Sequence, residues 1–234
     1  VVDIVSKTHT ASRRAGGVTA DHWVRRHVLH GAPRCDVLWI DEISQLDVGL
    51  WVQINKLAST GMQFLLSGDF NQFAPIGNNF RGAAVSETAF EGSGLLHTLG
   101  GGNQVVLTIC RRSEAMLFDF YSSLIAGGSR FDLPPSEAVR QAREQFPGTA
   151  PARWNLVISH QRRIRINREY NNIEAPPEAV LLEVKGKAAQ GNAGQTMKIW
   201  PGLQLLGCVS AEKKGVRNGC LYTVASVGEG LVYL

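Results

Sequence analysis

The first seventy residues alternate between apolar runs and amphipathic segments. Val1–Val5 and Val37–Ile40 are apolar runs of strand length, and "MQFLLSGD" at residues 62–69 predicts a third strand. Residues 19–30 are expected to be helical, and Gln45–Ser59 has apolar side chains at helical spacing. This order of strand, helix and strand predicts parallel βαβ units, in which ligands bind outside the carboxyl ends of the strands.

The second half of the chain has a less regular pattern. Strands are expected in "QVVLTI" (104–109) and "WNLVISH" (154–160), and helices within 111–128 and 161–172. Residues 127–153 combine Gly, Pro and many charges, so they predict a surface excursion. From about residue 176 the chain is expected to be β-rich, with a turn at Asn218–Gly219.

Composition and charge narrow the class of protein without identifying it. The 234 residues are 44% hydrophobic, as in a soluble globular protein, and 24 basic against 20 acidic residues leave a formal charge of +4. This mild excess is compatible with nucleic acid but does not demonstrate binding. The four cysteines are far apart, so we expect reduced thiols of an intracellular protein. No apolar run approaches the roughly 18–20 residues of a membrane span.

Two adjacent acids follow the second apolar run, in "VLWIDEISQLD". A strand that ends in Asp41 and Glu42 suits an enzyme that hydrolyses a phosphoanhydride, because Asp41 can hold Mg²⁺ through water and Glu42 can act as a base. The alternative is structural, since acids are also favoured where a helix begins.

A second polar strand end supports the catalytic interpretation. "LLSGDFNQFAPIG" places Asp69 at the end of the third apolar run and Gln72 three residues later. A glutamine there can sense the γ-phosphate of ATP and couple its loss to movement of a neighbouring domain. Alternatively, Gly68–Asp69 is a simple turn and Gln72 an exposed polar residue.

These segments resemble a known family. "IDEIS", "GDFNQFAPIG" and "LTICRRS" resemble motifs II, III and IV of superfamily 1 helicases, closest to the PIF-type and RecD-type branch with its viral relatives. "KTHTASRRAGGVTADHW" resembles the motif Ia region of that branch, and "NLVISHQRRIRIN" and "KGVRNGCLYTV" resemble parts of its second motor domain. The resemblance implies a P-loop NTPase with RecA-like parallel sheets. Residues 1–105 would form a first RecA-like domain, and 106–234 an incomplete second one, with a small β-barrel as a candidate insertion near 176–234.

The resemblance also implies roles in ATP hydrolysis. Asp41 would be the Mg²⁺ carboxylate and Glu42 the catalytic base, Gln72 would sense the γ-phosphate, and Asp69 would position neighbouring groups. Either Arg111 or Arg112 would be the arginine finger that stabilises transition-state charge. We favour Arg112, and two solvated arginines at a helix start remain the alternative. The implied cofactors are ATP and Mg²⁺.

Single-stranded DNA and duplex junctions are the partners that the resemblance implies, with RNA less favoured, for a motor that is expected to be monomeric. The candidate nucleic-acid-binding residues are Thr8, His9, Thr10, His22, His160, Arg162 and Arg165. A solvated helix face is the alternative for the last two. Trp23 could stack on a base, but a tryptophan within a helix is more often part of the core.

One element of the family's motor is absent from the sequence. No G-x-x-x-x-G-K-[ST] phosphate-binding loop occurs in it. We expect the chain to be a fragment whose loop lies upstream of Val1 and whose last arginine-bearing motif lies beyond Leu234. By itself it is expected to hydrolyse no ATP. The competing hypotheses are a viral-type superfamily 1 RNA helicase and a degenerate module that binds nucleic acid without hydrolysis.

Overall fold

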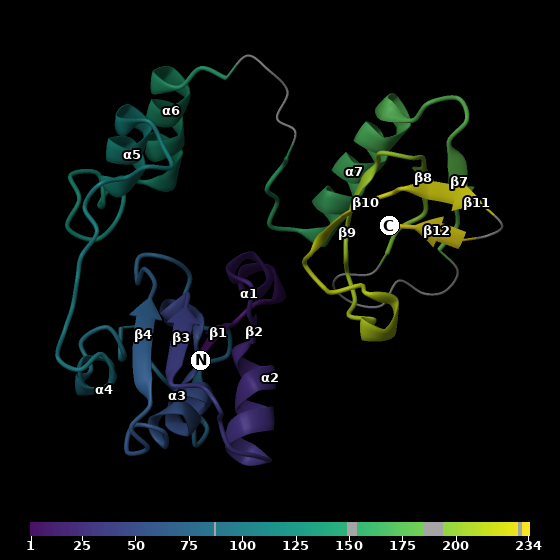
Figure 1. Ribbon diagram of the computed structural model, residues 1–234. Helices are drawn as coiled ribbons and strands as arrows, with labels where there is room; N and C mark the ends of the chain where they lie inside the picture. The colour runs from purple at the N-terminus through teal and green to yellow at the C-terminus, as the bar shows by residue number, and fades with distance from the viewer. Residues whose placement is uncertain (87, 149–153, 185–193, 229–230) are drawn as a thin grey trace. The chain divides into compact units, whose positions relative to one another are not determined.

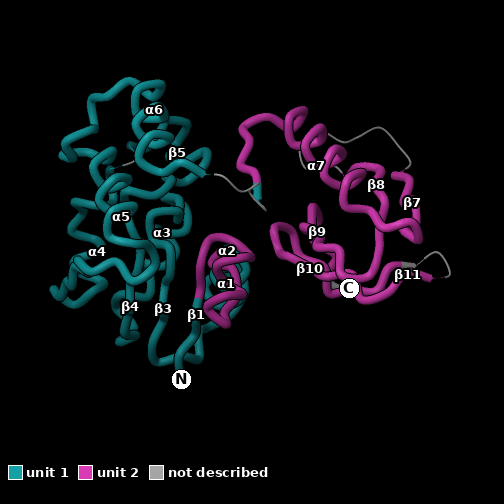
Figure 2. Tube along the Cα trace, turned by 90° about the horizontal axis from the view of Figure 1, so that it is seen from above, with its two compact units in different colours: residues 1–4, 21–154 teal, residues 5–20, 155–234 magenta. Residues whose placement is uncertain are grey.

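The structure is a computed structural model that describes residues 1–86, 88–148, 154–184, 194–228 and 231–234. The chain forms two compact units, Val1–Ile4 with Asp21–Trp154 and Val5–Ala20 with Asn155–Leu234 (Figure 2). The expected division at residue 105 stays a prediction.

A four-stranded sheet carries the predicted strands of the first half of the chain (Figure 1). Its strand order is β2-β1-β3-β4. β3 and β4 are parallel and pair from Val37↔Gln63 to Asp41↔Ser67, and β1 is parallel to β2. The strands are β1 Val2–Ser6, β2 Val18–Thr19, β3 Val37–Asp41 and β4 Gln63–Ser67. The prediction of an α/β fold with a parallel sheet is therefore confirmed.

Buried and half-buried residues alternate along β3, and the buried ones mark the side of the strand that packs into the core. Leu38 and Ile40 are fully buried, whereas their neighbours on the strand are half-buried. Helix α3, Val48–Asn55, contributes Trp51 and Ile54 to the buried set. Asp47 caps this helix by accepting a hydrogen bond from Leu50 N through Oδ1 (3.1 Å), so the helix begins directly after the turn that follows β3.

The other helical segments of the first hundred residues are short. They are α1 His9–Ala15, α2 Ala20–Val24, a π-helical turn Arg25–Leu29, a 3₁₀ turn Ile43–Gln45 and α4 Gly94–Leu99. A small antiparallel hairpin, β5 Asn79–Phe80 with β6 Ala83–Ala84, follows the turn after β4.

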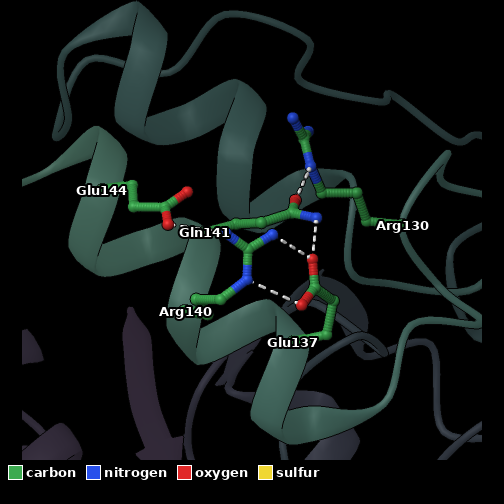
Figure 3. Close-up of polar contacts among 5 residues, drawn as sticks. All are labelled: Arg130, Glu137, Arg140, Gln141 and Glu144. Carbon is green, nitrogen blue, oxygen red and sulfur yellow. Dashed lines mark hydrogen bonds and ion pairs between the residues drawn. The ribbon is translucent and has the colours of Figure 1, made fainter.

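Two helices occupy residues 115–145, where α5 is Ala115–Ser122 and α6 is Pro135–Gln145. The rings of Phe120 and Phe146 meet edge to face with centroids 5.4 Å apart. Arg130 lies over the Phe120 ring. Its Nε donates a hydrogen bond to Gln141 Oε1 at 3.1 Å (Figure 3). A helix thus lies within the segment that was expected only to be a surface excursion.

Acidic and basic side chains along α6 form one polar network. Glu137 accepts two hydrogen bonds from the guanidinium of Arg140, which also pairs with Glu144, and a third from Gln141 Nε2 (Figure 3). These bonds, above all those from Arg140, lower the pKa of Glu137 to about 2. The spacings of three and four residues place all of these side chains on one face of the helix.

Two predicted strands are wrong. Residues 104–109 and 154–160 form no strand, and most of their apolar side chains are exposed: Leu107 is 90% and Ile158 is 108% accessible, whereas Val157 is half-buried. An apolar, β-branched sequence becomes a strand only when a neighbouring strand satisfies its N–H and C=O groups, and none does so for these runs among the described residues.

The C-terminal part consists of one long helix and short strand pairs, as expected for a β-rich segment. Helix α7 is His160–Glu174, and a 3₁₀ turn lies at Glu212–Lys214. The antiparallel pairs are β7 Val180–Leu182 with β8 Met197–Ile199, β9 Gln204–Leu206 with β10 Leu221–Thr223, and β11 Ser226–Gly228 with β12 Leu231–Tyr233. Whether they belong to an inserted barrel stays a prediction.

Candidate nucleotide and nucleic-acid site

Asp41 is held at the carboxyl end of β3 by the neighbouring strand. Ser67, its register partner on β4, donates from Oγ to Asp41 Oδ1 at 2.8 Å. Ser67 Oγ in turn accepts from Trp39 Nε1 at 2.8 Å. This relay orients the carboxylate before any ligand arrives. Sequence reasoning missed Ser67 and Trp39, although Ser67 directly precedes the Gly-Asp pair that it singled out.

Glu42 turns the chain sharply after the strand. Its backbone is left-handed (φ 57°, ψ 49°), which is uncommon for a residue other than glycine. Gly68, after β4, lies against this turn: a Cβ there would be 2.7 Å from both Ile43 N and Ile43 Cγ1. The turns after β3 and β4 therefore fit together only because residue 68 has no side chain.

The predicted residues after β4 form a compact turn. Asp69 Oδ1 accepts a hydrogen bond from Asn71 N (2.9 Å), and Asp69 O accepts one from Gln72 N (3.1 Å). Gln72 itself is exposed. Asp69 thus shapes the backbone that presents Gln72, which agrees with both a turn residue and a positioning role.

Arg111 and Arg112 are both exposed in the turn that precedes α5. Cys110 orders this turn, because its Sγ accepts a hydrogen bond from Ser113 N (3.4 Å) and lies 3.7 Å from the hydroxyl oxygen of Tyr121. Hydrogen bonds from the backbone of Arg112 and Ser113, and then from Tyr121, lower the pKa of the Cys110 thiol. The choice between the two arginines stays open.

The protein itself uses two of the hydroxyls that were assigned to nucleic acid. Thr8 Oγ1 caps α1 by accepting from Ala11 N (3.2 Å), and Thr10 Oγ1 donates to Gly219 O at 2.7 Å. His9, the first residue of α1, is half-buried. The nucleic-acid role of these residues stays a prediction.

Helix α2 brings His22 to the surface beside a buried tryptophan. Trp23 is only 2% accessible, and its Nε1 donates to Asp3 Oδ2 at 2.8 Å. The interpretation of Trp23 as a core residue is therefore confirmed, and it does not stack on a base. His22 is exposed and stays a candidate.

The basic helix α7 exposes its candidate residues. His160 and Arg162 are exposed, and Arg165 makes a surface ion pair with Glu169 at 3.8 Å. Asn171 fixes the helix to β8: its Nδ2 donates to Lys198 O and its Oδ1 accepts from Lys198 N, both at 2.8 Å. The binding role of the exposed residues stays a prediction.

The resemblance implies a site for Mg²⁺-ATP, and the residues of this chain provide part of such a site. Asp41 offers one oriented carboxylate, and a Mg²⁺ ion bound with ATP takes its other oxygen ligands from phosphate and water. Accordingly, no group of three or more His, Cys, Asp or Glu side chains among the described residues could hold a metal by itself. The phosphate-binding loop is absent from the sequence.

No helix in the described part of the chain has the length and apolarity to cross a membrane.

The sequence matches no family model, and no curated protein is significantly similar to it. Its fold, however, resembles solved Pif1 structures. One of these structures describes DNA unwinding at forked double-stranded DNA by two coordinating Pif1 helicases. It is 15% identical to this chain, with a TM-score of 0.57, and the match covers 99% of this chain and 62% of that one. Bacteroides Pif1 in complex with ADP-AlF3 and single-stranded DNA is 16% identical (TM-score 0.55; 99% and 61% covered). Candida albicans Pif1 is also 16% identical (TM-score 0.58; 96% and 58% covered).

The chain therefore has a mixed α/β fold like that of the solved Pif1 helicases, and it spans about three fifths of the length of those proteins. At these identities the similarity concerns the fold alone. What the chain binds and does is a separate question.

Proposed function

We propose that this chain is part of an ATP-dependent DNA helicase, in which Mg-ATP hydrolysis drives translocation along single-stranded DNA and separation of a duplex. The observation that carries the proposal is the paired edge of β3 and β4, where Ser67 orients Asp41 and Glu42 follows directly. The similarity of fold to Pif1 helicases supports it. Because the chain spans only part of those proteins, the activity is proposed for a protein that also carries a phosphate-binding loop.

Each residue then has a defined task. Asp41 would hold Mg²⁺ through water, and the bound ion would supply positive charge that offsets the charge of the phosphates. Glu42 takes a proton from the water that attacks the γ-phosphate, and Gln72 contacts that phosphate. Arg112, or Arg111 beside it, stabilises the charge that develops on the transferred group.

The test is ATP turnover in a protein in which this chain follows a phosphate-binding loop. Glu42→Gln is expected to lower the DNA-stimulated kcat by about 10²–10⁴-fold, since it removes the base but keeps the shape. Glu91→Gln, an exposed acid with no assigned role, serves as the matched control. A wild-type rate for Glu42→Gln would refute the assignment. The 234-residue chain alone is expected to show no turnover.

The partner and polarity are tested with the same protein. Stimulation of turnover by single-stranded DNA should exceed that by RNA of the same length. The resemblance to the PIF-type branch also implies unwinding in the 5′-to-3′ direction. Partial duplexes that carry only a 5′ or only a 3′ single-stranded tail should distinguish this direction from its reverse. Stronger stimulation by RNA would favour a viral-type RNA helicase.

A second candidate function is a module that binds nucleic acid without hydrolysing ATP. The absence of a G-x-x-x-x-G-K-[ST] loop from the sequence favours it. It predicts that the chain binds single-stranded DNA and that Asp41→Asn and Glu42→Gln change neither nucleotide affinity nor turnover in the longer protein. An effect of either substitution would exclude it.

A further inference from the structure

The hairpin β5–β6 presents a strained arginine at its tip. Phe80 pairs with Ala83, so Arg81 and Gly82 form a two-residue turn, and both have positive φ (51° and 83°). Such turns normally take Asn-Gly or Asp-Gly, because other residues with a Cβ are disfavoured in the left-handed region. A backbone conformation of this kind costs free energy and is often found at functional positions.

The base of the hairpin is fixed to the start of α3, which follows the acidic pair in the chain. Asn78 is 9% accessible; its Oδ1 accepts a hydrogen bond from Val48 N and its O accepts one from Val85 N, both at 2.9 Å. Val48 is the first residue of α3, seven positions after Asp41. The hairpin is therefore held at the carboxyl edge of the sheet, where ligands of α/β proteins bind.

The tip combines an aromatic ring with a cation. The guanidinium carbon of Arg81 lies 5.3 Å from the centroid of the Phe80 ring, and Phe80 is 48% accessible. Arg81 is the only charged residue between Asp69 and Glu87 in the sequence. An exposed ring with an arginine over it suits an unpaired base and its phosphate, because aromatic faces stack on any base and arginine pairs with phosphate.

We propose that Phe80 and Arg81 form a stacking site for one unpaired base of a single-stranded nucleic acid, with Arg81 contacting an adjacent phosphate. This inference rests on the proposed function, since it names a contact of the same motor with its track. None of the residues first assigned to nucleic acid lies in this hairpin. The site adds an aromatic contact to candidates that otherwise offer only hydroxyls, imidazoles and guanidinium groups.

The test is the affinity of the 234-residue chain for a fluorescein-labelled dT15 oligonucleotide, measured by anisotropy. Phe80→Ala is expected to raise Kd by about 5- to 100-fold, the effect of losing one stacked base, and Phe80→Trp to restore it. Arg81→Asn keeps a residue that tolerates the turn. It should weaken binding and reduce the slope of log Kd against log salt by about 0.7, as expected for one lost contact with single-stranded DNA.

Control variants and a control oligonucleotide separate stacking from a general loss of charge or fold. Phe131→Ala removes another exposed ring (55% accessible) and Arg143→Asn another exposed arginine, and neither should change Kd. An abasic oligonucleotide of equal length has no base to stack, so Phe80→Ala should bind it with the same affinity as the wild-type chain does. Circular dichroism should confirm that every variant retains its fold.

The inference is overturned if Phe80→Ala binds dT15 like the wild type, if it loses affinity equally for the abasic strand, or if the chain binds no single-stranded DNA. DNA-independent turnover of the longer protein should fall in Glu42→Gln and should be unchanged in the control variant Phe131→Ala. If Phe80→Ala does not weaken binding of dT15 while turnover still depends on Glu42, the hairpin site alone is rejected. The opposite pattern would reject the proposed hydrolysis and keep the site.

Discussion

Gly68 offers the sharpest test of how the candidate site is built. An alanine Cβ at this position would lie 2.7 Å from Ile43 N, 2.7 Å from Ile43 Cγ1 and 3.4 Å from the carbonyl carbon of Glu42. Gly68 is not among the residues with positive φ, so alanine suits its backbone conformation and the cost is purely steric. Because one of the close atoms belongs to the backbone, a change of rotamer cannot relieve the overlap.

The expected destabilisation follows from this overlap. Inserting a methyl group that displaces the backbone costs about 1–3 kcal/mol, so Gly68→Ala should lower the free energy of unfolding by that amount. Urea denaturation followed by circular dichroism measures it. Truncating Ile43 to alanine in the same chain should recover only part of the loss, since the contact with the backbone nitrogen remains.

Gly92→Ala provides the matched control, because a Cβ there meets no atom within 4 Å and Gly92 also lacks a positive φ. It should be neutral or stabilise the chain by up to about 1 kcal/mol. If Gly68→Ala destabilises no more than Gly92→Ala, the close fit of the two turns is wrong, and so is our account of why glycine precedes Asp69.

Three further predictions test other contacts. Ser67→Ala removes the hydroxyl between Trp39 and the Asp41 carboxylate and should lower the free energy of unfolding by about 1–3 kcal/mol in urea. Asn171→Ala should cost about 1–3 kcal/mol through two lost hydrogen bonds to the backbone of β8, whereas a thermal melt of its exposed neighbour variant Asn172→Ala should be unchanged. Glu137 has a folded-state pKa of about 2, below its unfolded value near 4.5, so its stabilising effect is present above pH 4.5 and is lost as the pH falls toward 2; NMR titration should show this pKa return toward 4.5 in Arg140→Gln.

Local patterns in the sequence were sufficient to predict which residues lie at the carboxyl edge of the sheet. Each of β3 and β4 is an apolar run that stops at a polar residue, so the positions of Asp41 and Asp69 followed from chain order alone. The same signal failed at residues 104–109 and 154–160. A run of apolar residues records a preference for extended backbone, but a strand also needs a neighbour for its hydrogen bonds, and that neighbour is not encoded locally.

The fold class, the order of elements in the sheet region and the residues that end its strands can be predicted from the sequence, because they depend on spacing over a few positions. Which side chains meet across the fold depends on tertiary packing. Ser67 contacts Asp41 because the register of β3 and β4 sets them opposite each other, and Thr10 donates to Gly219 across 209 positions of the chain. Such contacts depend on how separate elements pack, and no periodicity within either element specifies its partner.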